Sequence, residues 1–207
     1  MAEQTKAIKM TLAELIYIAE QLGATELFGI PDPYYGLNMS ERRVLKNRTE
    51  CLLEEKGILV RGFEKSELKR ADSITLIKTC IFCDKFAGFD YVVGGEQKSI
   101  LYYLKEDSAV RIENIGNVVD LKRILPKEII AEIKAVLLSE NNDGVFSFSV
   151  TYFTINAVEH ITVEKDEEKY VKISIDKDNG NVVRTEIETE ELIRELQHIG
   201  NFIDMEV

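Results

Sequence analysis

The stretch that decides the fold is Phe89-Asp90-Tyr91-Val92-Val93-Gly94-Gly95-Glu96-Gln97-Lys98-Ser99-Ile100-Leu101-Tyr102-Tyr103-Leu104. It contains two runs rich in β-branched and aromatic residues with a glycine pair between them, which is the pattern of a β-hairpin. A third run of this kind spans residues 109–112, so the sequence predicts a three-stranded meander. Residues 120–125 follow with the apolar spacing of a short helix.

The same order of elements returns later in the chain. Strand-like runs span residues 159–163, 170–175 and 181–187, with a tight turn at 178–180, and a helix is expected at 190–196. A helix opened by Pro126 and an aromatic extended run at 145–153 lie between the two meanders. Two such meanders can join edge to edge, which protects their edge strands. The sequence therefore predicts a single α+β domain over residues 1–207, with an antiparallel sheet, helices packed against it, and quasi-twofold halves at 1–125 and 126–207.

The N-terminal third has helical patterning. Thr11 and Glu14 form the sequence signature of a capping box, which predicts a helix over about residues 11–22. Ser40 is the expected cap of a second helix that ends at Lys56-Gly57. A third helix is predicted over residues 66–86, with a break near residues 71–73 as the alternative. The expected apolar face of the second helix consists of Val44, Leu45, Cys51, Leu52 and Leu53.

Composition indicates an ordinary globular protein. The 207 residues are 45% hydrophobic and 30% charged, a balance that supports a core and argues against disorder. No signal-peptide pattern opens the chain, and no stretch approaches the roughly 20 apolar residues of a membrane span, so we expect a cytoplasmic protein without a membrane partner. Three cysteines are too few and odd in number for a disulfide framework. We therefore expect Cys51, Cys80 and Cys83 to be reduced, buried and free of metal.

Charge disfavours nucleic acid as a partner. The chain carries 26 basic and 37 acidic residues, a net charge of −11, which repels a phosphate backbone. The most basic stretch contains Arg42, Arg43, Lys46 and Arg48, but glutamates at positions 41, 50, 54 and 55 dilute it. The expected role of this stretch is a solvated helix face with charges of both signs.

The sequence contains no recognisable catalytic or cofactor motif. Cys80 and Cys83 have the spacing of a metal site, but only Cys51, His160 and His198 remain to complete a set of about four ligands. Residues 176–180 match the opening of an EF-hand loop, yet Ile187 occupies its twelfth position, where the loop needs glutamate. No phosphate-binding or dinucleotide fingerprint occurs. We therefore expect a protein that is not an enzyme and that uses no cofactor or metal.

Several segments resemble a known family. These are the helix of Leu-Ala-Glu-Leu type that ends at Leu22-Gly23, the turn containing Pro31, the helix ending in Glu55-Lys56-Gly57-Ile58-Leu59, and the repeated meander-helix order. Together they resemble the EspG-type cytoplasmic chaperones associated with type VII secretion, especially over residues 12–31, 52–59 and 89–125. The resemblance implies a quasi-twofold α+β fold that binds a helical secretion substrate of WXG or LXG type and keeps it soluble and correctly addressed. The second half departs from the first, because it has no helical segment matching residues 40–86.

Two other classes of function stay open. The helix-helix-extended order of residues 11–60 also resembles a winged helix, in which Arg42, Arg43, Lys46 and Arg48 would face DNA. The other class is an enzyme with a site built from dispersed carboxylates.

Protein binding has two candidate surfaces. One is the proline-bounded turn with Ile30, Tyr34 and Tyr35, although the two tyrosines can instead pack the turn onto the core. The other is the hairpin loop formed by Gly94, Gly95, Glu96, Gln97 and Lys98. The sequence also leaves a homodimer open.

Overall fold

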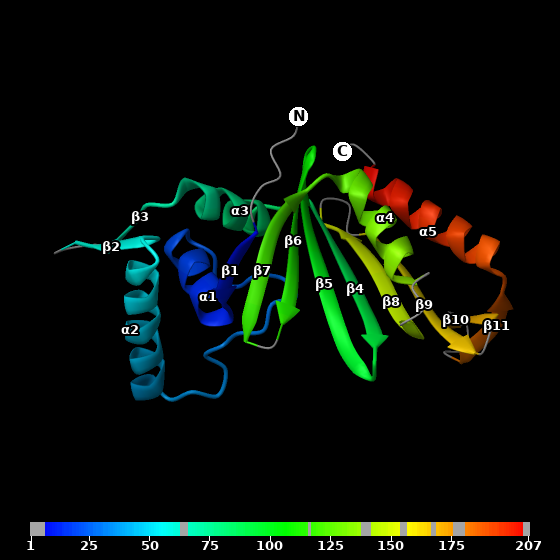
Figure 1. Cartoon of the computed structure of the whole chain (residues 1–207), viewed down its shortest axis with the longest axis horizontal. Helices are drawn as coiled ribbons and strands as arrows, with labels where there is room; N and C mark the ends of the chain where they lie inside the picture. Colours follow the sequence, from blue (N-terminus) through cyan, green and yellow to red (C-terminus); the bar gives the residue numbers. More distant parts are fainter. Residues whose placement is uncertain are drawn as a thin grey trace. The chain divides into compact units, whose positions relative to one another are not determined.

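The computed structural model describes residues 7–62, 66–115, 117–137, 142–153, 157–166, 169–175 and 181–204 (Figure 1). The chain divides into two compact units. Unit 1 consists of Met1–Cys83 and Ile112–Arg123, and unit 2 consists of Asp84–Arg111 and Ile124–Val207. Strand β6 (Ser108–Ile115) carries the chain from unit 2 back into unit 1.

Unit 1 is built around helix α1 (Leu12–Gln21). Residues 14–19 of this helix are all buried, and it packs against β1, α2 and α3. Strand β1 pairs antiparallel with β7, with Ile8 opposite Leu121. Strands β2 and β3 form a separate two-stranded sheet. The bounds of these elements are β1 (Ile8–Thr11), α2 (Met39–Glu55), β2 (Leu59–Arg61), β3 (Ser66–Leu68), α3 (Ala71–Ile81) and β7 (Val118–Ile124).

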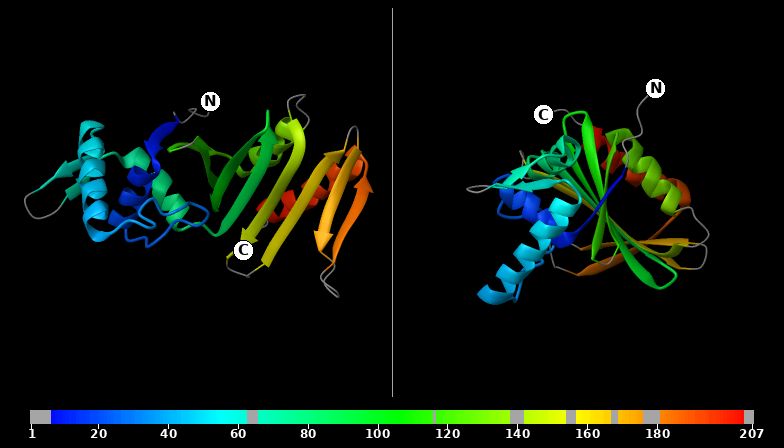
Figure 2. Two further views of the ribbon diagram at one scale, coloured as in Figure 1. Left: turned by 90° about the horizontal axis from the view of Figure 1, so that it is seen from below. Right: turned by 60° about the vertical axis from the view of Figure 1, so that its left-hand side comes forward.

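Unit 2 is an antiparallel sheet covered by two helices. Its strands lie in the order β5-β4-β8-β9-β10-β11, and Figure 2 shows α4 and α5 on the same face of these strands. The bounds are β4 (Lys85–Val93), β5 (Glu96–Lys105), α4 (Pro126–Leu137), β8 (Asn142–Tyr152), β9 (Ala157–Asp166), β10 (Lys169–Ile175), β11 (Val182–Ile187) and α5 (Thr189–Asp204).

The core of unit 2 is formed by alternate residues of the strands and by helix residues three or four positions apart. Alternate residues of the central strands point to the helices, because side chains along a strand alternate between the two faces of the sheet. The buried strand residues of this kind include Ala87, Phe89, Tyr91, Phe146, Phe148 and Val150. Helix α5 contributes Leu192, Leu196, Ile199 and Ile203, which are three or four residues apart and therefore lie on one face. Phe89 and Phe148, opposite each other in register, meet edge to face with ring centroids 6.4 Å apart.

The α+β class with a large antiparallel sheet is confirmed, and five helices lie within the described residues. The capping box of α1 is also confirmed, since Thr11 Oγ1 accepts from the Glu14 amide and the Glu14 carboxylate accepts from the Thr11 amide. Pro126 opens α4 as expected. The quasi-twofold relation and the single domain stay predictions, and the turn expected at 178–180 lies outside the described residues.

Three expectations about local structure are wrong. Helix α2 is capped by Asn38 and not by Ser40, because the Asn38 side chain accepts from the amides of Ser40 and Glu41. Residues 66–86 are not one helix but strand β3, helix α3 and the start of strand β4. Residues 120–125 belong mainly to strand β7, where Val119 and Leu121 are buried at a spacing of two and pair with β1.

The buried face of α2 also differs from the expected one. Thr49 and Leu53 are buried, whereas Val44 is 65% exposed and Cys51 is exposed. The expectation of three buried cysteines is therefore wrong for Cys51, while Cys80 is buried and Cys83 is half-buried. Within the part of the chain that the structure describes, none of the three forms a disulfide, and burial raises the pKa of the Cys80 thiol well above its usual value.

Candidate protein-binding surface

The connection between α1 and α2 is a series of tight turns. Asp32 Oδ1 accepts from the Tyr34 amide at 2.8 Å, which is the Asx-turn that aspartate commonly forms. The Asp32 carbonyl accepts from the Tyr35 amide at 3.1 Å, and the Tyr34 carbonyl accepts from the Leu37 amide at 3.2 Å. Gly36 has a φ of +77°, which glycine adopts without strain. These bonds hold the two adjacent tyrosines in defined and different directions.

Tyr34 points into the core of unit 1. Its side chain is 3% exposed, and the Lys46 Nζ lies 5.1 Å from the centroid of its ring. Burial, together with the charges of Glu20, Asp32 and Glu50, raises the pKa of Tyr34 to about 12. Among the described residues its hydroxyl has no hydrogen-bond partner. Tyr34 therefore anchors the turn, as the alternative reading of the sequence allowed.

Tyr35 points away from the core. It is 87% exposed, and Met39, which opens α2, is 89% exposed. Phe28 is also largely exposed, whereas Ile30 is half-buried. We call Phe28, Ile30, Tyr35 and Met39 the turn surface. Sequence reasoning missed Phe28 and Met39, although large apolar residues in a turn-rich segment, away from any helical stripe, are the signal that would have found them.

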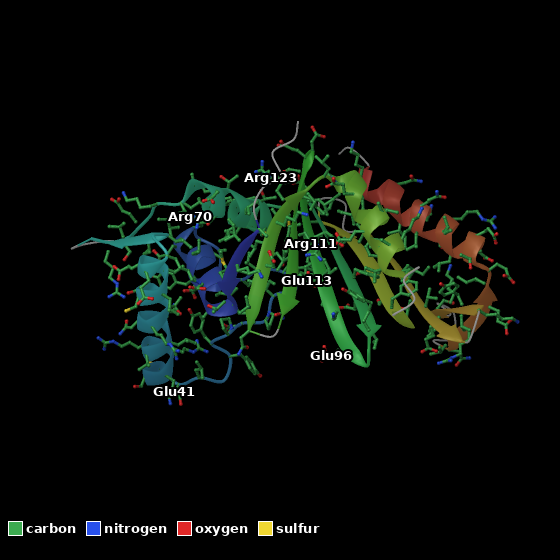
Figure 3. All side chains as sticks on the ribbon, viewed as in Figure 1. Glu41, Arg70, Glu96, Arg111, Glu113 and Arg123 are labelled. Atoms are coloured by element: carbon green, nitrogen blue, oxygen red, sulfur yellow. The ribbon has the colours of Figure 1, made fainter. Side chains whose placement is uncertain are left out.

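Charged groups flank the turn surface. Glu41 closes the capping box of α2, because its carboxylate accepts from the Asn38 amide at 2.9 Å, and its side chain is labelled at the start of α2 in Figure 3. Arg42 donates from Nε to the Leu37 carbonyl at 3.1 Å, which ties the start of α2 to the turn. Arg43 is exposed beside them. The connection between α1 and α2 therefore combines exposed apolar side chains with charged ones at the start of α2, a composition typical of protein-binding sites.

The second candidate surface is the tip of the β4–β5 hairpin. Val93 pairs with Glu96, so Gly94 and Gly95 form a two-residue turn, and their φ values are +60° and +76°. This turn needs positive φ at both positions, which explains the glycine pair without a binding role. Glu96 and Gln97 are exposed, and Lys98 is half-buried opposite Tyr91. The tip, with Glu96 labelled in Figure 3, is polar and carries no exposed apolar side chain from position 94 to position 98.

The structure brings the predicted site residues together in two places. Ile30, Tyr34 and Tyr35 share one turn of unit 1, and Gly94, Gly95, Glu96, Gln97 and Lys98 share one hairpin of unit 2. Of these two, the turn surface is the better candidate, because it exposes an aromatic ring and a methionine side chain, whereas the hairpin tip is polar.

The described residues contain no group of three or more His, Cys, Asp or Glu side chains placed to hold a metal ion. His198 lies on α5 and is exposed. None of the helices in the described parts of the chain is both long and apolar enough to cross a membrane.

Comparisons with known proteins give a likeness in structure only. No protein-family model matches the sequence, and the search of curated proteins found no match. The fold is similar to that of the type VII secretion system chaperone EspG5 of Mycobacterium tuberculosis, solved in complex with a PE25-PPE41 dimer. The TM-score is 0.61 at 7% sequence identity, and the match covers 94% of this chain and 95% of that one. The chain is therefore similar in fold to a type VII secretion chaperone along almost its whole length.

Proposed function

We propose that this chain is a cytoplasmic protein-binding factor, which acts as a chaperone or targeting factor for a helical type VII secretion substrate. The observation that carries the proposal is the similarity in fold to EspG5 over 94% of the chain. The order of elements and the apolar spacing that resemble EspG-type chaperones predict the same function.

The turn surface is the proposed docking site. A helical substrate presents apolar residues three or four positions apart, and such a stripe binds to exposed apolar side chains of its partner. Tyr35 and Met39 offer such side chains, and aromatic residues and methionine are enriched in the centres of protein interfaces. The charged groups of Glu41, Arg42 and Arg43 would form the rim. The proposed partner is a protein of WXG or LXG type encoded beside this chain.

The test is the double substitution Tyr35→Ala with Met39→Ala. Both side chains are almost fully exposed, so the melting temperature should change by no more than about 2 °C. Affinity for the neighbouring WXG-type or LXG-type protein, measured by calorimetry after co-expression has identified it, should fall at least tenfold, since buried hot-spot residues cost about 2 kcal/mol or more when truncated.

Val60→Ala is the matched control, because Val60 is an apolar residue of unit 1 that is 49% exposed but lies on β2, outside the turn surface. It should leave the affinity unchanged. Unaltered affinity in the double variant would exclude the turn surface, and failure to bind any WXG-type or LXG-type protein would contradict the proposed function itself.

A further inference from the structure

Strand β11 ends the strand order of unit 2. It pairs with β10 along its whole length, from Tyr170 opposite Ile187 to Ile175 opposite Val182. Within the described residues no strand pairs with its other edge, and Figure 2 shows it as the outermost strand of this sheet. The outer edge of β11 therefore presents backbone N–H and C=O groups that are available for pairing with another chain.

The residues of β11 do little to block such pairing. Natural edges are commonly protected by proline, by bulges or by charged side chains, especially lysine. Residues 182–187 contain no proline, and their register with β10 is continuous. Val182 is 62% exposed and Val183 is 40% exposed. The two charged residues, Arg184 and Glu186, have opposite signs and lie two positions apart, with Thr185 between them.

We propose that β11 pairs antiparallel with β11 of a second copy of this chain, about a twofold axis at Thr185. In a twofold antiparallel pair one residue lies opposite itself, so the axis position fixes every other pairing. An axis at Arg184 would place two guanidinium groups opposite each other. An axis at Thr185 places Arg184 opposite Glu186 of the second copy, twice, and places Val183 opposite Ile187.

Both faces of the sheet agree with this register. Side chains two positions apart share a face, so Val183 and Thr185 lie on the same face as Ile187, which is buried in the core with α5. The Val183–Ile187 pairs would therefore join the apolar cores of the two copies. Arg184 and Glu186 lie on the opposite face, where they pair with Glu164 at 3.1 Å and Lys169 at 2.7 Å within one copy. These partners are exposed, so Arg184 and Glu186 can exchange them at low cost.

Charge reversal tests the register. The full-length chain should be a dimer by analytical ultracentrifugation. Arg184→Glu alone and Glu186→Arg alone should each weaken the dimer at least tenfold, because each places like charges opposite each other twice. The double variant with both reversals should regain the dimer, since it restores both cross-chain pairs. Glu164→Gln with Lys169→Gln is the control for the contacts within one copy, and it should leave the dimer intact.

A cross-link gives a second and independent readout. In a Cys51→Ser background, Thr185→Cys places two thiols opposite each other at about 4.5 to 5.5 Å between Cα atoms, which is within disulfide range. Mild oxidation should give a covalent dimer, whereas Val183→Cys in the same background should not. A monomer at all concentrations, or a dimer that Arg184→Glu leaves unchanged, would overturn the proposal. Neither result bears on the proposed docking of a secretion substrate, because the turn surface belongs to unit 1.

Discussion

At the residue scale, the buried hydroxyl of Tyr34 predicts an effect on the stability of unit 1 at neutral pH. It is buried and has no hydrogen-bond partner among the described residues, and an unpaired buried polar group costs about 1 to 3 kcal/mol. Tyr34→Phe keeps the ring and removes that group, so we expect it to raise the free energy of unfolding by about 1 kcal/mol. Urea denaturation at pH 7.5 measures the change. Tyr34→Ala is the contrasting variant and should lower it by about 3 kcal/mol or more through the cavity it leaves.

The same residue predicts a loss of stability in alkali. The pKa of Tyr34 is raised to about 12 in the folded protein, whereas an unfolded tyrosine has a pKa of about 10. The unfolded state therefore loses the tyrosine proton at a lower pH than the folded state does. The stability linked to this proton is complete below pH 10 and is lost as the pH rises from 10 to 12. At pH 11 the loss should be about 1 kcal/mol. Tyr34→Phe should lack that part of the loss, and identical pH profiles for the two proteins would contradict the assignment.

The different directions of Tyr34 and Tyr35 show why the site could be predicted from the sequence only in part. The prolines and glycines of residues 29–36 identify a turn, and the two tyrosines identify an apolar surface or anchor. The burial of Tyr34 depends on the hydrogen bond from its amide to Asp32 and on the position of its ring against Lys46. Lys46 lies on α2 and pairs with Glu20 of α1, so the residues of the turn alone do not predict which ring is buried.

At the scale of elements, the start of α1 depends on an ion pair with the end of α2. The Glu14 side chain is fully buried, and the Lys56 Nζ lies 2.7 Å from its carboxylate while remaining 40% exposed. Removing one partner of a buried pair leaves an uncompensated charge. We expect Lys56→Met to lower the free energy of unfolding by about 1 to 2 kcal/mol, since water at the exposed lysine moderates the larger cost of a fully buried pair.

Two further variants distinguish this pair from an ordinary surface contact. Glu14→Gln combined with Lys56→Met should be more stable than Lys56→Met alone, because the buried group is then neutral and can still accept from the Thr11 amide. Lys69→Met removes an exposed pair with Glu67 at 2.6 Å and should change stability by less than about 0.5 kcal/mol. A double variant less stable than Lys56→Met would contradict the idea that the uncompensated charge of Glu14 causes the loss.

The elements that could be predicted are those decided by neighbouring residues. Helix α1 has its own cap and apolar stripe, and the β4–β5 hairpin has its own turn. The sequence predicts a helix where the structure has strand β7, because the spacing of Leu121, Ile124 and Leu125 also fits a helical face. Its true conformation is decided by pairing with β1, far away in the sequence. Residues 66–68 likewise become a strand by pairing with β2 and not by local propensity.

At the scale of the whole molecule, the net charge predicts whether the chain binds nucleic acid. The order α1, α2 and the β2–β3 hairpin is compatible with the winged-helix alternative, and Arg42, Arg43 and Arg48 are exposed on α2. The net charge of −11 opposes binding, however. We expect no retardation of a 30-base-pair duplex at 150 mM salt in a gel-shift assay. A retarded band that disappears in Arg42→Ala with Arg43→Ala would instead establish the DNA-binding alternative.

The pairing of β1 with β7 also has a consequence for folding during synthesis at the ribosome. Residues 8–11 emerge first, but their partner, at 118–121, is made about a hundred residues later. At a synthesis rate of roughly 5 to 20 residues per second, that interval lasts about 5 to 20 s. Throughout it the first strand has no sheet to join, and the nascent unit 1 holds α1 without the strand that completes its fold. A cellular factor that shields growing chains can therefore act on β1 during this interval, before the protein proposed to protect others has completed its own fold.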